Sequence, residues 1–434
     1  MCIPGHPSGA GAPQHREIDA DRLPVDGRLP PEISGDYLRN GPNPRFGSSG
    51  AACWTADGDA MLHRVRLAGG RASYANRFVR TPALRAEEAA GRALWPGDPG
   101  RAGLPGAEVV GPELAHTARD CPCVNVVRHA GRLLALADSA SPFLISPELA
   151  TIGRETFGGL LTDGAGAHPR IDPATGELVL FCCVPGEPYL TWSVIGADGF
   201  PARIQTPVDG VTGPVTIHDM ALTSTYLVLV VPPPPGHRER GTRIALVPRD
   251  GRPVRWLASE PFWLAHVANA YDETAAGGSS RVVLDYVREP APGGPGVLSR
   301  VRLDPASGHV SHERLAQAEV AFPRIDDRQL TRPHDVIAVT RPGTCSPAWF
   351  DTRTGQLATW AAGPLIVGEQ TFVPHPGDPA PARGWWLAFA TDRADLTSRL
   401  LVLPAGDPAS GPVATVRLPQ RVPPGQHGTW LPAT

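Results

Sequence analysis

The sequence of 434 residues contains no lysine, and all 40 of its basic residues are arginines. This absence excludes Schiff-base catalysis, a lysine general base and a lysine-bearing phosphate loop, because each mechanism requires that side chain. The formal net charge is -3 and no basic run stands out, so the electrostatic footprint of a nucleic-acid-binding protein is also missing. We therefore expect no nucleic-acid partner and consider small-molecule chemistry first.

Two further absences bear on the cellular location of the protein. No run of about 18 apolar residues occurs, and the opening MCIPGHPSGAGAPQHRE lacks the apolar core of a signal peptide. The seven cysteines are odd in number and spread over a long chain, unlike a secreted disulfide framework, so we interpret them as buried thiols. These features predict a cytoplasmic protein without a transmembrane segment.

Turns and short strands are abundant. The 50 prolines and 48 glycines interrupt the chain too often for long helices, while 41% hydrophobic residues are too many for disorder. The β-type runs are RLLALAD at 132, ELVLFCCV at 177, TYLVLVVP at 225, RVVLDYV at 281, HDVIAVT at 334, WWLAFAT at 385 and RLLVLPA at 399. The segments DPATGEL, DPASGHV and DTRTGQL are typical of turns that end at a glycine before the next strand. The pattern favours a β-propeller or another large all-β array.

One segment interrupts this pattern. Residues 82–95, PALRAEEAAGRALW, predict a helix that caps or lines one face. We assign residues 17–434 to a single β-propeller domain that includes this segment. We expect residues 1–16 to form a mobile N-terminus.

Four histidines fit the repeat of a propeller. His168, His218 and His266 are 50 and 48 residues apart, about one blade each, and His427 follows 161 residues later. Equivalent positions in successive blades would direct the imidazoles to the central axis, where they would most naturally share a metal. For any single histidine a structural role is the better interpretation, and His334 in RPHDVIAV closely mimics His218. Periodicity alone leaves both interpretations open.

Nine short motifs extend the argument over nearly the whole chain. In order they are YLRNGPNPRF, DGDAMLHRVRL, YANRFVRT, AHPRIDP, IHDM, HVANAYD, FPRIDDR, GEQTFVP and GQHGTW. With these motifs the sequence resembles the carotenoid cleavage oxygenase family. No single motif is decisive, but nine in the same order make an accidental resemblance improbable.

The resemblance implies a seven-bladed β-propeller with a short helical and loop cap over an axial non-haem Fe(II), where O2 cleaves a conjugated double bond into two carbonyls. By motif match the metal ligands are His168, His218, His266 and His427, and His334 is not a ligand. The glycines beside His427 would let the backbone pass close to the axis. Four neutral imidazoles leave two octahedral positions for O2 or water, whereas zinc with four protein ligands would be closed. We expect no catalytic residue beyond the metal site.

The resemblance also implies glutamates that orient the imidazoles. Glu369 of GEQTFVP is unchanged, Asp138 of LLALADS replaces a glutamate, and Ala321 of VAFPRID stands where a third is expected. His266, which we assign to the third glutamate, would therefore lack its usual partner. This departure keeps a divergent or inactive member of the family under consideration.

Two positions bear on the substrate. In the stilbene-cleaving branch of the family a tyrosine and a lysine engage the substrate's phenol, and the matching positions here are Phe78 and Ala137. We therefore expect an apolar pocket for a hydrophobic conjugated substrate, which reacts with O2, and the resemblance allows transient contact with a membrane surface. The sequence leaves three functions open: a carotenoid cleavage dioxygenase-like enzyme, a metal-dependent isomerase or epoxidase, and a binding propeller without turnover.

Overall fold

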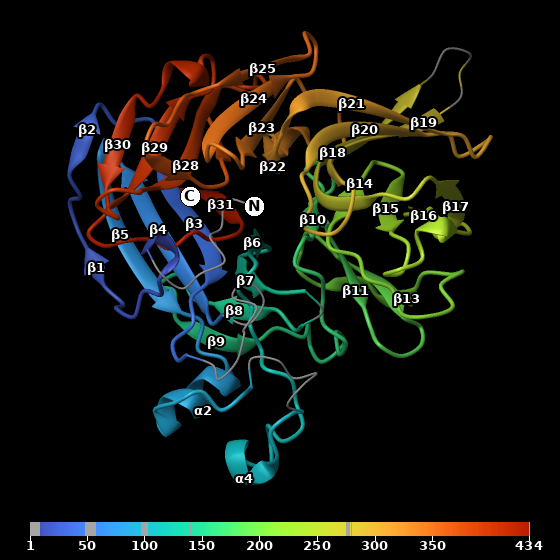
Figure 1. The fold of residues 1–434 in the computed structure, drawn as a ribbon, viewed down its shortest axis with the longest axis horizontal. Helices are drawn as coiled ribbons and strands as arrows, with labels where there is room; N and C mark the ends of the chain where they lie inside the picture. The colour runs from blue at the N-terminus through green and yellow to red at the C-terminus, as the bar shows by residue number, and fades with distance from the viewer. Residues whose placement is uncertain are drawn as a thin grey trace.

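The computed structural model of the protein describes residues 9–47, 58–96, 103–138, 140–274, 278 and 280–433. Within these residues seven antiparallel sheets stand in a ring, which Figure 1 shows along its axis. The fold is a seven-bladed β-propeller, so the predicted fold class is confirmed. The assignment of residues 17–434 to one domain stays a prediction.

Five of the described blades are four-stranded meanders in which strands consecutive in the chain pair with one another. Their strands are β6 Asn125–His129, β7 Arg132–Leu136, β8 Phe143–Ile145, β9 Thr151–Arg154; β10 Arg170–Ile171, β11 Leu178–Cys183, β12 Leu190–Ile195, β13 Pro201–Pro207; β14 Met220–Leu222, β15 Tyr226–Val231, β16 Thr242–Pro248, β17 Arg255–Ser259; β18 Trp263–Thr274, β19 Ser280–Glu289, β20 Val297–Leu303, β21 Val310–Glu319; and β22 Ala321–Arg324, β23 Val336–Arg341, β24 Ser346–Asp351, β25 Gln356–Thr359. Pairing of sequence neighbours explains why short apolar runs between turns suffice to build each blade.

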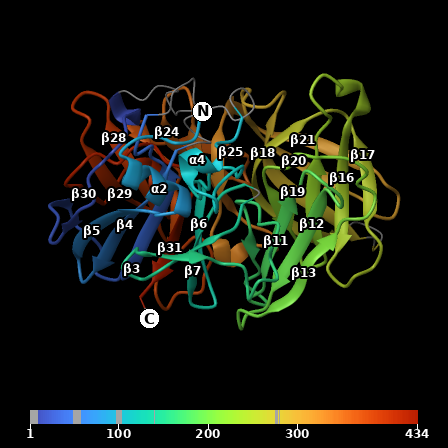
Figure 2. The ribbon, with the colours of Figure 1, turned by 90° about the horizontal axis from the view of Figure 1, so that it is seen from below.

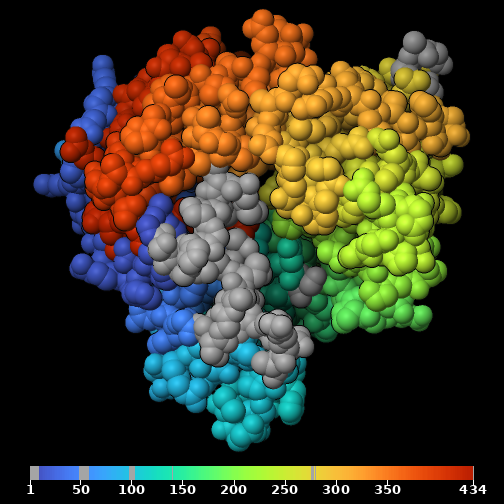
Figure 3. All heavy atoms as spheres, in the orientation of Figure 1, coloured from blue at the N-terminus to red at the C-terminus, as the bar shows by residue number. Residues whose placement is uncertain are grey.

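The other two blades each combine strands from opposite ends of the chain. Their strands are β1 Asp19–Ala20, β2 Val25–Gly27, β3 Gly35–Pro42, β4 Ala60–Ala68, β5 Arg71–Phe78, β26 Leu365–Val367, β27 Thr371–Pro374, β28 Gly384–Asp392, β29 Ser398–Pro404, β30 Ala414–Arg417 and β31 Gly428–Pro432. One blade has the order β1-β5-β4-β3-β31. The other has the order β2-β30-β29-β28-β26, and β27 also pairs with β28. Strands β31 and β2 therefore close the ring, and the blue and red ends of the chain meet on one side in Figure 3.

The predicted strands are confirmed, because each of the seven apolar runs overlaps one of these strands. The three predicted turns adopt one geometry, in which the glycine N–H donates to the carbonyl of the leading aspartate: Gly176 to Asp172, Gly308 to Asp304 and Gly355 to Asp351. The φ angles of these glycines are 73°, 76° and 71°, a left-handed conformation that favours glycine.

Apolar side chains of neighbouring blades pack against one another. In one cluster, Val230 and Leu246 of one blade are buried with Val282 and Leu284 of the next. Burial of a single large aliphatic side chain contributes roughly 1.5–3 kcal/mol, so these clusters hold adjacent blades firmly. The inner strands are thereby fixed around the axis.

The predicted helix is shorter than expected. It forms α2 Pro82–Ala90, capped by Thr81, whose side chain accepts from the Leu84 N–H, and it ends at Gly91, whose φ is 67°. The prediction that it continues to residue 95 is wrong, because the left-handed Gly91 terminates it. A second short helix, α4 Ala107–Val110, packs against α2 through Val110 and Ala83.

The helices flank the blade that contains β4 and β5. Leu84 of α2 is buried with Met61 and Phe78 of those strands, and Figure 2 shows α2 and α4 beside each other. In the part of the chain that the structure describes, the remaining helical turns are the 3-10 segments Gly9–Gly11, Arg238–Arg240, Asp327–Gln329 and Pro408–Ser410. No helix among the described residues is long and apolar enough to cross a membrane. The cytoplasmic location stays a prediction.

The predicted mobile N-terminus lies partly outside the described residues, because 1–8 are not described. In the described part, the Gln14 backbone N–H donates to the Asn43 side chain, and Asn43 donates back to the Gln14 carbonyl. Mobility of residues 1–16 stays a prediction.

Candidate metal centre

The predicted histidines occupy matching positions in the propeller. His168 and His218 lie in the segments just before β10 and β14, and His266 lies in β18. These are the first strands of three successive blades. His427 directly precedes β31, the strand that completes the blade of β1, β3, β4 and β5, which is the first blade in the chain. The 48–50-residue spacing therefore equals one blade, as expected from the sequence.

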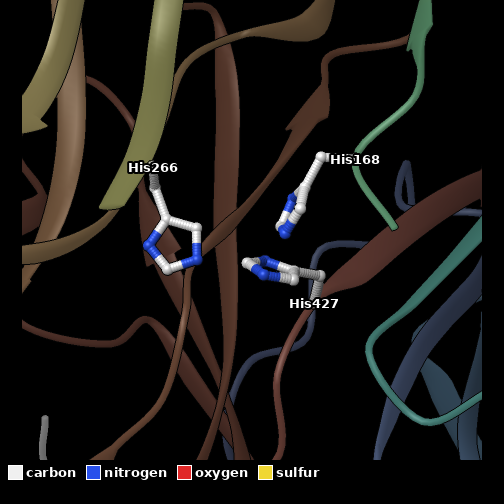
Figure 4. Close-up of side chains that lie close together, drawn as sticks. All are labelled: His168, His266 and His427. Carbon is white, nitrogen blue, oxygen red and sulfur yellow. The ribbon is translucent and has the colours of Figure 1, made fainter. Parts of the chain in front are cut away.

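The four rings converge. The centroid of His168 is 4.6 Å from those of His218 and His427 and 5.5 Å from that of His266, and the His266–His427 separation is 5.0 Å. One ring nitrogen each of His168, His266 and His427 lies within 4.8 Å of the others, and Figure 4 shows these rings pointing toward one another. The structure thus brings all four predicted ligands together.

The Nε2 atoms of His168, His266 and His427 are buried and have no hydrogen-bond partner among the described residues. Burial, followed by the neighbouring imidazoles, keeps the pKa of His168 and of His266 well below the ordinary value, so both are neutral at neutral pH. A neutral imidazole whose second nitrogen has no hydrogen-bond partner can donate that nitrogen's lone pair to a metal ion. The donor set fits a borderline divalent ion such as iron.

Glu369 orients His427. Its Oε1 lies 2.8 Å from Nδ1 of His427, and its Oε2 accepts from the Gly428 N–H at 3.1 Å and from Nη1 of Arg324 at 3.2 Å. Because an ionised carboxylate only accepts, Nδ1 carries the proton and Nε2 presents its lone pair. Burial raises the pKa of Glu369, but Arg324 and His427 outweigh it and lower the pKa below the ordinary value.

Asp138 takes the corresponding position at His218. Its Oδ2 lies 3.2 Å from Nδ1 of His218, and its Oδ1 accepts from the Ala167 N–H at 3.1 Å. Burial is the largest single influence on the pKa of His218 and lowers it, but the hydrogen bond to Asp138 and the negative charges of Asp138, Asp219 and Glu289 together raise it more, so the net shift is upward. The shorter aspartate therefore still reaches its imidazole.

His266 lacks such a partner. No carboxylate among the described residues lies within 4.0 Å of its ring, and Ala321 at the start of β22 has no side-chain acceptor. The adjacent Phe322, held at φ 50°, instead places its ring 5.2 Å from that of His266 and 5.8 Å from that of His427. The sequence did not single out Phe322, although it lies in the quoted FPRIDDR motif.

Sequence reasoning also missed Asp219 and Arg324. Oδ1 of Asp219 lies 4.0 Å from Nδ1 of His168 and accepts from Arg170 at 2.8 Å. Its Oδ2 accepts from the Val267 N–H at 2.7 Å, which links the loop before β14 to β18. The available signal was its position next to His218 in IHDM.

His334, the close sequence mimic, lies apart from this cluster. Its Nδ1 accepts from Asn269 at 3.0 Å, and its Nε2 faces Oδ2 of Asp285 at 3.2 Å. Its side chain is fully buried in this polar network, which fits the structural interpretation.

The two pocket candidates lie in separate apolar clusters. Phe78 is buried with Met61 and Leu84, and Cζ of Arg45 lies 5.6 Å from the centre of its ring. Ala137 is buried directly before Asp138. Their contact with a substrate stays a prediction.

Comparisons with known proteins agree with this geometry. The family described as retinal pigment epithelial membrane protein matches residues 11–432. A carotenoid cleavage oxygenase of Mycobacterium tuberculosis is 33% identical over 98% of this chain and 96% of its own. The apocarotenoid-15,15'-oxygenase of Synechocystis is 28% identical over 94% of this chain and 92% of its own.

Solved structures extend the likeness to the fold. The lignostilbene dioxygenase of Pseudomonas brassicacearum superimposes with a TM-score of 0.86 and 27% identity over 99% of both chains. Cobalt-substituted apocarotenoid oxygenase of Synechocystis superimposes with a TM-score of 0.85 and is 26% identical over 98% of both chains. A propeller with histidines converging on its axis is the framework of an alkene-cleaving oxidoreductase. The chain belongs to the carotenoid cleavage oxygenase family.

Proposed function

We propose that this protein is an Fe(II)-dependent oxygenase that cleaves a conjugated C=C bond of an apocarotenoid, a stilbenoid or a related alkene. The C=C bond and O2 are consumed, and each of the two product carbonyls receives one oxygen atom. The observation that carries the proposal is the convergence of four imidazoles, three of which hold a buried Nε2 without a partner.

The protein's own groups would hold and orient the metal. His168, His218, His266 and His427 are the proposed ligands, and iron(II), when bound, supplies the one-electron chemistry with O2. Four neutral ligands leave the full positive charge of the metal in place. Glu369 and Asp138 keep the protons of two imidazoles on Nδ1, away from the metal.

The choice of substrate class rests on two supports. The relatives named above act on apocarotenoids or lignostilbenes according to their names. The chain also replaces the phenol-binding pair expected in the stilbene-cleaving branch by Phe78 and Ala137. We therefore favour a polyene or a phenol-free alkene. Transient contact with a membrane surface stays a prediction.

The test is anaerobic reconstitution with Fe(II), followed by a screen of polyenes and stilbenes under 18-O2. Two carbonyl products, each carrying one labelled oxygen, are expected. A rearranged product without label would instead identify a metal-dependent isomerase, and an epoxide would identify an epoxidase. These are the second candidate function, because His266 lacks the carboxylate partner that the family resemblance implies. Protein that binds iron and ligand without turnover would be a binding propeller.

A further inference from the structure

A second feature lies beside the candidate metal centre, behind Phe322. A cavity of about 30 Å³ is lined by Phe322, Phe389, Arg39 and Gly425, with Thr340 and Thr391 also in its wall. A cavity needs roughly 10–15 Å³ to hold one water, so this one admits a small ion and excludes a polyene or a stilbene. It is therefore too small to hold the proposed substrate.

The guanidinium of Arg39 is the charged group in this wall. Only 4% of Arg39 is exposed, and no carboxylate among the described residues lies within 4.0 Å of it. Its Nη2 donates to the Pro423 carbonyl, its Cζ lies 5.0 Å from the centre of the Phe389 ring, and its Nε is buried without an acceptor. Burial lowers the pKa of Arg39 to about 10, so the group is still charged at neutral pH.

No ion pair among the described residues neutralises this charge. Glu369 interacts with Arg39 only at a distance, because its two oxygens are engaged by His427, Gly428 and Arg324. The charge of Arg39 also acts on His63, whose pKa is lowered first by burial and then by this neighbour. A buried charge without a counterion is costly, and a partner of opposite sign would offset the cost.

Gly425 keeps the loop close to the guanidinium. A Cβ added there would lie 2.5 Å from Nε and 2.6 Å from Cζ of Arg39, closer than any real contact. A side chain at this position would therefore displace the guanidinium or fill the cavity.

We propose that this cavity binds one small monovalent anion of chloride size, held by Arg39. The test compares melting temperatures in sodium chloride or bromide with those in sodium gluconate at equal ionic strength, because gluconate is too large for the cavity. At a halide concentration 100 times the Kd, the protein as purified should melt about 3 °C higher than in gluconate.

The variant Arg39→Met should lose this halide-specific increment. Arg243→Met is the matched control, because Arg243 also lies over an aromatic ring, Trp256 at 3.9 Å, and donates to a carbonyl, that of Gly210, but is exposed. The control should keep the increment. An equal increment in all three proteins would overturn the proposal.

Crystals of the unaltered protein grown in bromide give a second readout. An anomalous peak beside Arg39 is expected, and Gly425→Ala should remove it. Ordered water without bromide at this position would overturn the proposal. Because this experiment uses the unaltered protein, it decides the question even if Arg39→Met does not fold.

Discussion

The four imidazoles at the axis do not have equal support. Glu369 and Asp138 fix the proton positions of His427 and His218, whereas His266 has no carboxylate behind it. Groups that orient a ligand also contribute to metal affinity, typically about 10-fold to 100-fold. Single substitutions should therefore separate the two contributions.

The first prediction concerns iron content. Purified protein should hold about one iron per chain, because four converging imidazoles form a divalent-metal site. His218→Ala and His427→Ala should each abolish bound iron, measured by elemental analysis. His334→Gln, which alters the sequence mimic outside the cluster, should retain it. Full iron occupancy in both alanine variants would contradict the ligand assignment.

The second prediction concerns the missing carboxylate. Ala321→Glu should tighten iron binding about 10-fold to 100-fold, the range typical for a group that orients a ligand. Competition with a chelator measures the affinity, and Ala321→Gln separates the effect of charge from that of size. Unchanged or weaker retention in the glutamate variant would show that His266 is already held in place, for example by Phe322.

The third prediction concerns the substrate. A phenol near Phe78 and Ala137 would lack two hydrogen-bonding partners, each worth about 0.5–1.5 kcal/mol. We expect kcat/KM for a short apocarotenoid or a 4-methoxystilbene to equal or exceed that for the matching 4-hydroxystilbene. A strong preference for the phenol would refute this expectation.

Arg45 decides what such a refutation would mean. Its Cζ lies 5.6 Å from the centre of the Phe78 ring, which makes it the candidate cation that this prediction tests. If the phenol is preferred and Arg45→Met removes the preference, arginine has replaced the tyrosine and lysine of the stilbene-cleaving branch. Persistence of the preference would point to another group.

At the scale of single residues, the sequence predicted those site residues whose spacing follows the blade repeat. His168, His218 and His266 could be placed because a repeat converts sequence distance into position around an axis. Asp219 and Phe322 could not, because their proximity to the site depends on loop conformation. Phe322 in particular requires a positive φ that the sequence FPRIDDR does not signal.

At the scale of elements, a buried network joins two strands of one blade to the segment that precedes β23 in the next blade. Asp285 of β19 accepts from Nε and Nη2 of Arg300 in β20 at 2.6 and 2.7 Å, and faces His334, which precedes β23. Burial raises the pKa of Asp285, but the hydrogen bond from Arg300 and the contact with His334 lower it more, so the net pKa is depressed. The carboxylate therefore stabilises the fold above the unfolded pKa of about 3.9.

The fourth prediction follows from this network. Asp285→Asn leaves buried charge unpaired, which typically costs about 3–5 kcal/mol, or roughly 3–5 °C in Tm for a chain of this length. The difference from the unaltered protein should be largest near pH 7. It should shrink as the pH falls below about 4, because the unaltered protein loses the contribution when Asp285 is protonated.

Asp26→Asn is the control for an exposed pair. Asp26 of β2 accepts from Arg417 of β30 with a similar two-bond geometry, but in solvent. Exposed pairs contribute little, so its Tm should change slightly. Equal shifts in both variants would contradict a special role for the buried network.

Strands were easier to predict than helices in this chain. The seven predicted strands each carry their own apolar run, and turns such as DPATGEL fix where the next strand begins. The helix at 82–95 was placed correctly but extended too far, because the apolar and small residues of GRALW continue the pattern while the backbone of Gly91 ends it.

At the scale of the whole molecule, the proposed metal would connect four blades. His168, His218 and His266 belong to three consecutive blades, and His427 leads into the strand that completes the first blade. The pairing of β31 with β3 and of β2 with β30 holds the ring closed independently of the metal. That β2 joins the last blade by pairing with β30 could not be read from the sequence, because β2 is only three residues long, Val-Asp-Gly, and carries no apolar run.

The fifth prediction tests this connection. Removal of iron by chelation should lower Tm by about 3 °C relative to protein held at an iron concentration 100 times the Kd, since a ligand that binds only the folded state stabilises it. His218→Ala should show no difference with and without chelator. Identical melting of iron-loaded and chelated protein would contradict a metal that joins the blades.

The position of β31 also has a consequence for synthesis. Strands β3 to β5 leave the ribosome early, but their partner β31 and the neighbouring His427 follow roughly 350 residues later. At about 5–20 residues per second, the first blade waits roughly 20–70 s with one edge unpaired. A nascent chain can therefore complete neither that blade nor the four-histidine cluster, and the proposed iron would find all four imidazoles together only after β31 has emerged.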